Sequence, residues 1–324
     1  MSLKIARLDF NTPVHFGGVG IGLESTEEIV HSDTLFSALC HSWVNLYGKA
    51  DLDDLLISFE QKPPFLISSC FIYNSDTYFL PRPHTPPPGF ESVDVRESHG
   101  KDVKRLNYLP REIFGLWARR EKINYETIKE DYGSSYRFFL VPRVAIDRTN
   151  SNSQIYYCGT IKFQEGCGLF CLIKFNDRSY IQKVKMSFSL LGELGLGGER
   201  SSGLGKFKFV WVDADDEWNR LLSFKGDGYL CISLLHPENP DTIEDLMNGA
   251  SYTLLERRGW FLSPFSTKQY KRKTVTMLAE GSVFTKSITG HLVPVTPEIW
   301  IKEGNPHLIY RYGYAFVIPV KLKE

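Results

Sequence analysis

The sequence has no net charge that would attract a polyanion to the molecule as a whole. Its 324 residues include 38 Lys and Arg against 38 Asp and Glu, so any binding to nucleic acid must come from local patches. Residues 101–120 hold six basic and two acidic side chains, and residues 256–273 hold six basic side chains beside the single Glu256. Such runs also occur on ordinary solvated surfaces, so they permit RNA binding without establishing it.

Long apolar runs and paired cysteines are also missing. No run approaches the roughly 20 apolar residues of a membrane span, and the N-terminal MSLKIARLDF lacks the apolar core of a signal peptide. The six cysteines form no CxxC pair and no cluster with histidine, and Cys167 and Cys171 lie in an apolar run typical of a protein core. We therefore expect a cytoplasmic protein in a reducing compartment, with no membrane association, no cofactor and no bound metal.

The most unusual segment is GELGLGGERSSGLG at residues 192–205, with six glycines in fourteen positions. Glycine allows positive φ and lets backbone N–H groups approach an anion closely. Arg200, Ser201, Ser202 and Lys206 add cationic and hydroxyl donors for phosphate oxygens. The segment is thus a candidate phosphate-binding loop, with a flexible surface turn as the simpler alternative.

The order of elements around this loop limits what it can bind. Residues 181–191 carry apolar side chains at spacings of three and four, which predicts a helix that Gly192 or Gly195 would end. Residues 206–212, KFKFVWV, alternate with the period of a strand. A P-loop or a dinucleotide-binding loop needs strand, loop and helix in that order. Since the order here is helix, loop, strand, we exclude NTP and NAD binding.

The N-terminal part alternates strands and helices. A strand is predicted at residues 3–10, a helix that begins with Ser32 or Asp33 as its N-cap, and a strand at residues 64–73. RFFLVPRVAIDR and IYYCGTIKF resemble the two arms of a hairpin, and CGLFCLIKF is a further strand. With the loop's own helix and strand, this gives the ferredoxin-like order of strand, helix, two strands, helix and strand.

A segment with poor periodicity, at about residues 76–135, interrupts this first unit. It contains PRPHTPPPGF, whose proline content excludes regular helix or sheet there. We predict an irregular insertion that is partly disordered at residues 83–103.

The C-terminal part predicts a second unit of the same kind. GYLCISLLHP, SYTLLERRGW and RYGYAFVIPVKL have strand character, TVTMLAEGSVFT suggests two short strands, and NPDTIEDLMNGA a helix. The predicted fold is α+β, with two tandem ferredoxin-like units. Residues 1–212 would form the first unit and residues 213–324 the second, which has only Gly313 in place of the glycine loop.

A glycine loop between the second helix and fourth strand of a ferredoxin-like unit is typical of RAMP proteins, the RNA-binding subunits of CRISPR effector complexes. Within that superfamily the chain resembles the family of the fourth subunit of the Csm (type III-A) complex. The matching motifs span nearly the whole chain in the family's order: PVHFG (13–17), IVHSDTLFSAL (29–39), LGGERSSGLGKF (196–207), RRGW (257–260), KRKTVTMLAEGSVF (271–284) and RYGYAFVIP (311–319).

The resemblance implies a non-catalytic subunit that holds the 5′ tag of the crRNA in antiviral and anti-plasmid defence. It also implies two protein partners, the large polymerase-like subunit and the neighbouring RAMP backbone subunit. The hairpin at about residues 143–163 would be a thumb that reaches over the guide–target RNA duplex.

The resemblance and the basic patches together give a set of candidate RNA contacts in the N-terminal segment, the hairpin, the glycine loop and the second basic run. They are His15, Arg143, Arg148, Gly197, Gly198, Arg200, Ser201, Ser202, Gly203, Gly205, Lys206, Arg257, Arg258, Lys271, Arg272 and Lys273. Phe207, Phe209, Tyr156 and Tyr157 are candidates for stacking on bases.

Three alternatives remain open at the level of sequence. A metal-independent crRNA-processing endonuclease of the same fold would use a histidine such as His15, His31 or His41 as general base or acid. Asp33 could orient an attacking water through Mg²⁺, or could simply complement the N-terminus of a helix. A protein-only adaptor would use the acidic turn at residues 213–217 and the proline-rich insertion as docking surfaces.

Overall fold

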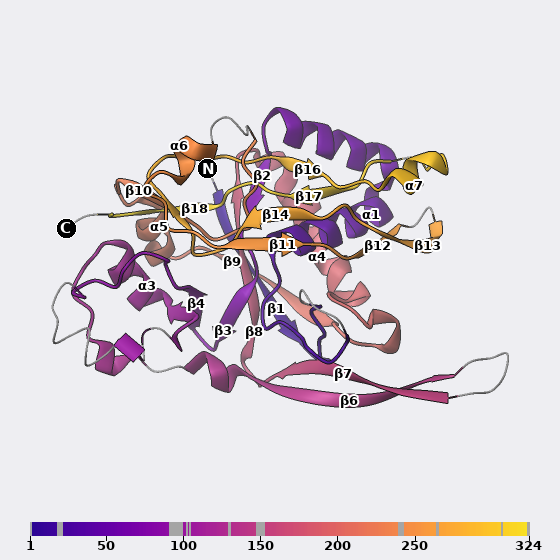
Figure 1. Cartoon of the computed structure of the whole chain (residues 1–324), viewed down its shortest axis with the longest axis horizontal. Coiled ribbons are helices and arrows are strands. Elements are labelled where there is room, and N and C mark those ends of the chain that lie inside the picture. The colour runs from indigo at the N-terminus through magenta and orange to yellow at the C-terminus, as the bar shows by residue number, and fades with distance from the viewer. Residues whose placement is uncertain are drawn as a thin grey trace.

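The computed structural model describes residues 2–17, 22–90, 100–101, 103, 105–128, 131–146, 153–238, 243–263, 266–305 and 307–322. The fold is mixed α/β with antiparallel sheets (Figure 1), as the sequence predicts at this coarse level. The helices of the described part are α1 (Ser32–Gln61), α3 (Arg111–Ala118), α4 (Ile181–Leu194), α5 (Asp216–Ser223), α6 (Ile243–Met247) and α7 (Glu298–Lys302). None of them combines the length and apolar character needed to cross a bilayer.

A seven-stranded antiparallel sheet forms the centre of the N-terminal part. Its strands run in the order β5-β4-β3-β8-β1-β9, and β2 also pairs with β8. In β1, Ala6 lies opposite Cys171 of β8 and Trp211 of β9. The strands are β1 (Ser2–Phe10), β2 (Phe65–Ile67), β3 (Phe71–Asn74), β4 (Thr77–Pro81), β5 (Tyr108–Pro110), β8 (Cys167–Phe175) and β9 (Phe207–Asp213).

The C-terminal part contributes one small sheet and three two-stranded ribbons. The sheet has the order β15-β10-β18, and the ribbons pair β11 with β14, β12 with β13 and β16 with β17. The bounds are β10 (Gly228–Cys231), β11 (Leu254–Arg257), β12 (Trp260–Ser263), β13 (Ser266–Lys271), β14 (Val275–Leu278), β15 (Val283–Phe284), β16 (Leu292–Pro294), β17 (Tyr310–Tyr312) and β18 (Val317–Val320).

Both faces of the central sheet are covered, which explains why β8 is apolar along nearly its whole length. On one face, α1 and α4 bury Trp43 and Phe188 against the sheet. On the other face, α3 and α5 pack Trp117 and Trp218 in a core shared with β10 and β18. This second core contains residues of both the N-terminal and the C-terminal part, so it holds the two parts together. Burial of a large apolar side chain contributes about 1.5–3 kcal/mol to such a contact.

Strands β6 (Tyr136–Ile146) and β7 (Ser153–Phe163) form the predicted hairpin. It projects from the body of the molecule (Figure 1), with Tyr136 opposite Phe163 at its base. Several apolar side chains on its arms are exposed, including Ile146 at 68% and Ile155 at 65%. These side chains leave apolar surface exposed along the hairpin.

The prediction that the insertion is irregular is wrong for much of its length. Within residues 76–135, β4 and β5 extend the central sheet and α3 covers it. The physical reason is burial, because Leu80, Leu109 and Phe114 are fully enclosed, and short elements can carry such anchors without a readable period. The predicted disorder at residues 83–103 falls partly on residues outside the described set.

Two predicted helix ends can be compared with the structure. The C-terminus of α4 is confirmed, since Gly195 is its cap with φ of 82° and donates its N–H to Leu191 O at 2.8 Å. The prediction that Ser32 or Asp33 is the N-cap of α1 is wrong. The N-cap is His31, whose side chain forms no capping hydrogen bond. Ser32 instead accepts a hydrogen bond from Leu234 N at 3.0 Å, and Asp33 is fully buried in ion pairs described below.

Candidate nucleic-acid interface

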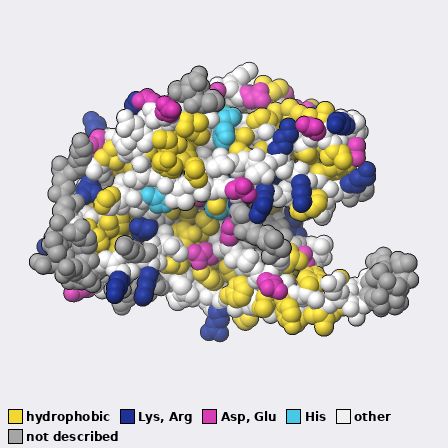
Figure 2. Space-filling model, in the orientation of Figure 1, with side chains coloured by type: hydrophobic (Ala, Val, Ile, Leu, Met, Phe, Trp, Pro, Cys, Tyr) yellow, Lys and Arg dark blue, Asp and Glu magenta, His cyan; other side chains and the backbone are white. Residues whose placement is uncertain are grey.

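The glycine loop forms one wall of a groove of about 590 Å³, here called the loop groove. The start of α1 and residues of β11, β12 and β13 form the opposite wall. In Figure 2 the surface is hollowed between the hairpin and the C-terminal strands above it. The residues that line the loop groove are Phe16, Gly17, Glu27, Ile29, Val30, His31, Thr34, Ser37, Ala38, His41, Gly195, Leu196, Gly197, Gly198, Glu199, Arg200, Ser201, Arg257, Trp260, Phe261, Gln269 and Arg272.

The glycine loop is a packed structure rather than a flexible turn. Gly197 and Gly205 have φ of 103° and 81°, values that side chains rarely tolerate. A Cβ atom on Gly205 would lie 2.2 Å from Leu196 O, and one on Gly197 would lie 2.5 Å from His15 O. The glycines are therefore required for close backbone contacts, which hold the loop in place beside the groove.

His15 connects the loop to the hairpin through two hydrogen-bond contacts. Its Nδ1 lies 2.7 Å from Gly159 O in β7, and its carbonyl accepts the N–H of Gly198 at 2.8 Å. Since His15 is buried and does not line the loop groove, its position is structural. The expectation that its side chain contacts RNA in the groove is not supported by this geometry.

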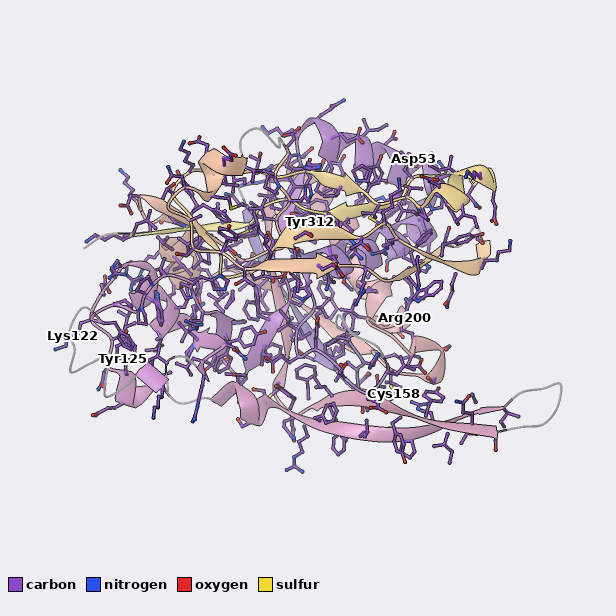
Figure 3. All side chains as sticks on the ribbon, viewed as in Figure 1. Asp53, Lys122, Tyr125, Cys158, Arg200 and Tyr312 are labelled. Atoms are coloured by element: carbon purple, nitrogen blue, oxygen red, sulfur yellow. The ribbon has the colours of Figure 1, made fainter. Side chains whose placement is uncertain are left out.

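Arg200 is the cation that the loop offers to the groove. It forms no ion pair with a carboxylate of the described residues, and burial lowers the pKa of its guanidinium. Figure 3 shows Arg200 in the space between the hairpin and the C-terminal strands. Ser201 also lines the groove, whereas Ser202, Gly203 and Lys206 are exposed and do not.

The opposite wall carries a second cation, Arg272. Burial, and then the charge of Arg311, lower the pKa of Arg272 to about 10. Its Nε has no hydrogen-bond partner within the described structure. The charge of Asp33 partly offsets these effects on the pKa, but no carboxylate of the described residues forms an ion pair with Arg272. A largely enclosed guanidinium without such a partner suits an external anion.

Three other residues of the second basic run lie outside the groove. Lys271 is exposed and its ammonium lies 5.1 Å from the ring centre of Trp260. Arg258 is half-exposed beside Glu256 at 3.5 Å, and Lys273 is exposed.

Arg257 has a different partner from the one predicted. Its guanidinium donates to both carboxylate oxygens of Asp33, at 3.1 and 3.0 Å, and Arg311 donates to the same carboxylate. Burial opposes the charged carboxylate, but Arg257 and Arg311 hold the pKa of Asp33 well below its ordinary value. Asp33 is thus neither an N-cap nor available to a metal, and Arg257 is a structural ion-pair residue in the groove wall.

A second buried ionic cluster lies beside the first. His31 Nδ1 is 2.8 Å from Glu280 and its Nε2 is 3.3 Å from Glu27. Burial alone would lower the pKa of His31, but these carboxylates raise it to about 10. A ring that is protonated at neutral pH and held at both nitrogens cannot act as a general base. His41 lines the groove, and burial with the charge of Arg200 lowers its pKa.

The predicted stacking residues divide into two groups. Phe207 is buried, and Phe209 stacks on Phe188 of α4 at 5.3 Å, so both belong to the core and the stacking prediction is wrong for them. Tyr157 is 45% exposed on the hairpin, and Tyr156 lies opposite Arg143 there. Arg148 lies outside the described residues.

Trp260 and Gln269 are groove residues that the sequence prediction omitted. Trp260 is 58% exposed and lines the groove beside Arg272. The RRGW motif contains this tryptophan, so an exposed aromatic next to basic residues was a usable signal for base stacking. Gln269 carries no comparable signal in the sequence.

Comparison with known proteins identifies the family. The RAMP superfamily model matches residues 7–208, and the CRISPR Csm4 C-terminal domain model matches residues 225–320. The CRISPR system Cms protein Csm4 of Methanocaldococcus jannaschii is 26% identical, with 100% of this chain and 99% of that protein covered. The protein of the same name from Thermococcus onnurineus is also 26% identical, with 92% and 93% covered.

Two solved structures show the same fold. The chain matches one in a Csm1-Csm4 cassette in complex with cA4 with a TM-score of 0.65 and 22% identity, covering 100% of both chains. It matches one in a Csm3-Csm4 subcomplex of the type III-A interference complex with a TM-score of 0.65 and 21% identity, covering 98% and 99%. The chain therefore belongs to the RAMP superfamily, in its Csm4 branch.

Proposed function

We propose that this chain is a non-catalytic RNA-binding subunit of a type III-A CRISPR effector complex, and that it holds the 5′ tag of the crRNA in the loop groove. The observation that carries the proposal is that Arg200 and Arg272, on opposite walls of one groove, form no ion pair with a carboxylate of the described residues. Single-stranded RNA offers phosphates to such cations and bases to an exposed aromatic such as Trp260.

The partners follow from what the similar structures contain. Those structures pair Csm4 with Csm1 in one case and with Csm3 in the other. By this likeness the chain joins the large polymerase-like subunit to the RAMP backbone. The contacts of both ring nitrogens of His31 with carboxylates agree with a structural rather than a catalytic role for this residue.

The architecture proposed for this role is two tandem ferredoxin-like units, at residues 1–212 and 213–324. The strand order β3-β8-β1-β9, with α1 and α4 on one face, supports the first. The order β15-β10-β18 supports the second, together with the bridge from Ser251 to Val283 beside β15. In the first unit, hairpin β6–β7 would be the thumb that contacts the guide–target duplex.

The test is the retention of crRNA by the assembled complex when Arg200 is replaced by Ala. We expect Arg200→Ala to weaken retention about tenfold, and to reduce the slope of log affinity against log salt by about 0.7, the value for one phosphate on a single strand. Arg178→Ala is the matched control, because Arg178 is exposed and lies outside the groove. Equal retention in all three proteins would remove the loop from the RNA site and favour a protein-only adaptor.

A further inference from the structure

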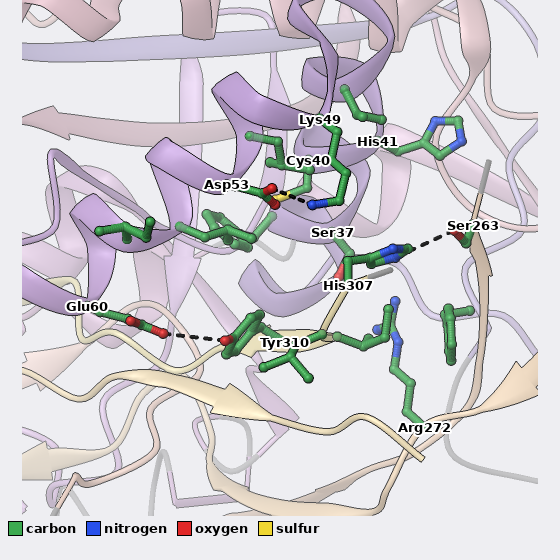
Figure 4. Close-up of a pocket in the computed structure, with 18 residues that line it drawn as sticks. Ser37, Cys40, His41, Lys49, Asp53, Glu60, Ser263, Arg272, His307 and Tyr310 are labelled. Carbon is green, nitrogen blue, oxygen red and sulfur yellow. Dashed lines mark hydrogen bonds and ion pairs between the residues drawn. The ribbon is translucent and has the colours of Figure 1, made fainter. Parts of the chain in front are cut away.

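A second cavity, of about 400 Å³, opens beside α1 and has no part in the function described so far. We call it the helix cavity. Figure 4 shows it between α1, which carries Ser37 and Cys40, and the segment that carries His307 and Tyr310. Apolar side chains such as Phe36, Val44, Leu56, Phe261 and Leu308 make up about half of its 18 lining residues.

The helix cavity adjoins the loop groove. Four residues, Ser37, His41, Phe261 and Arg272, line both. A strand of RNA lying in the groove therefore passes the mouth of the cavity, and a base that leaves the stack there has an apolar space to enter. The volume is within the range of sites that enclose small organic ligands, about 300–1,000 Å³.

The charges of the cavity differ between its two ends. Lys49 pairs with Asp53, which leaves Arg272 as a cation of the lining without a carboxylate partner in the described structure. Glu60, at the end away from Arg272 in Figure 4, accepts a hydrogen bond from Tyr310 at 3.3 Å. An anionic phosphate is thus favoured at the Arg272 end and disfavoured at the Glu60 end.

Uncharged polar groups lie near the Arg272 end. Ser263 Oγ is 3.5 Å from His307 Nε2. Burial, and then the charge of Lys49, lower the pKa of His307, which favours the neutral ring. The Ser263 hydroxyl and the His307 ring thus make this end of the lining polar.

We propose that the helix cavity receives one unstacked nucleobase of the bound crRNA, with the adjacent phosphate on Arg272. This proposal rests on the proposed function. A protein side chain would also fill an apolar cavity, but it would leave the Arg272 guanidinium without an anion. A nucleotide satisfies the apolar walls and the cation together, and the continuity with the groove supplies its route of entry.

The test compares crRNAs in which single nucleotides of the first ten are abasic. The complex is assembled on an equal mixture of unmodified and abasic crRNA with different labels, and the retained ratio is measured. We expect the retained amount of abasic crRNA to fall about tenfold or more at one position, because only that nucleotide loses a base held by the cavity. Similar small losses at all ten positions would overturn the proposal.

The cavity is identified by filling it. Val44 lines it, and Val44→Phe should reduce retention of unmodified crRNA to that of the sensitive abasic crRNA, with no further loss when both changes are combined. Leu46→Phe is the matched control, because Leu46 is on the same helix but is 38% exposed and lines neither site. Arg272→Gln should weaken retention and reduce the salt slope by about 0.7, unlike Arg178→Gln.

The failure of this inference is distinguishable from failure of the proposed function. If Arg200→Ala weakens retention while Val44→Phe does not, the groove holds RNA and the cavity does not hold a base. If Val44→Phe retains crRNA but loses a protein subunit, the cavity binds a protein side chain, which also contradicts the inference. If neither variant changes retention, both proposals are contradicted.

Discussion

Asp33 is the residue on which the junction between the two parts of the chain depends. Its carboxylate holds Arg257 and Arg311, which come from positions 224 and 278 residues away. Removal of one partner from a buried ion pair leaves an uncompensated charge, which costs far more than an exposed pair contributes.

We expect Asp33→Asn to lower the free energy of unfolding by about 3–5 kcal/mol, measured by denaturant titration. Asp53→Asn is the control, since Asp53 pairs with Lys49 near the surface, and its loss should be about 0.3–0.5 kcal/mol. In an assembled complex, target-RNA cleavage should survive Asp33→Asn. Equal stability losses for the two variants would contradict the buried network, and a lost cleavage product would make Asp33 catalytic.

His31 makes stability depend on pH. Its pKa is raised from 6.5 to about 10, because Glu280 and Glu27 outweigh the burial that would lower it. Because the pKa of His31 is higher in the folded state than in the unfolded state, its protonation stabilises the fold. This stabilisation is fully present below the pKa of the unfolded state, about 6.5, and is lost as the pH rises toward 10.

The free energy of unfolding of the unchanged protein should therefore fall between pH 7 and pH 10, and it should fall less for His31→Gln. His41→Gln is the control, since the pKa of His41 is lowered and the ring does not titrate in that window. Stability curves of His31→Gln and the unchanged protein that run parallel would show that His31 is not charged in the folded state.

At the scale of elements, the glycine loop offers a matched pair of substitutions. Gly203 and Gly205 both have positive φ, but a Cβ on Gly203 meets nothing within 4 Å, whereas one on Gly205 would lie 2.2 Å from Leu196 O. Gly203→Ala should cost only the backbone strain, about 1–2 kcal/mol. Gly205→Ala should cost clearly more and weaken crRNA retention, measured by denaturation and by the retention assay. Equal effects would mean that close packing does not shape the loop.

The hairpin can be tested through one exposed pair. Val144 and Ile155 lie opposite each other and are 55% and 65% exposed. Replacing both with Ser should change the stability of the chain by little, about 0.5 kcal/mol per site, yet weaken the binding of target RNA to the crRNA-loaded complex. Ile299 and Ile301 of α7, both exposed, form the control pair. Equal target affinity for all variants would remove the thumb role.

Elements with local signals were predictable from the sequence. The helix at Ile181–Leu194, its glycine cap and the hairpin each depend on side chains near one another in the chain. The insertion was not predictable, because α3 has eight residues and β5 has three, too few for a period. Its order comes from burial of Phe114 and Trp117 against the other parts.

For the molecule as a whole, the sequence located the glycine loop but not the groove that faces it. The opposite wall, with Trp260 and Arg272, lies more than fifty residues further along the chain, and only the fold brings it to Arg200. The same limit explains the error at Arg257. The sequence does not show which residue of a basic run is buried against a carboxylate. In this structure it is Arg257, which donates to Asp33.

The proposed role of the chain is to hold the 5′ tag of the crRNA in the loop groove. Purification of the complete complex through this subunit, followed by sequencing of the 5′ ends of the bound RNA, tests this role for the unchanged chain and for Arg200→Ala. We expect RNAs with one uniform 5′ tag from the unchanged chain, and a reduced yield of them with Arg200→Ala. If the unchanged chain brings down RNA without a common 5′ sequence, or no RNA with all protein partners present, the chain does not hold the tag.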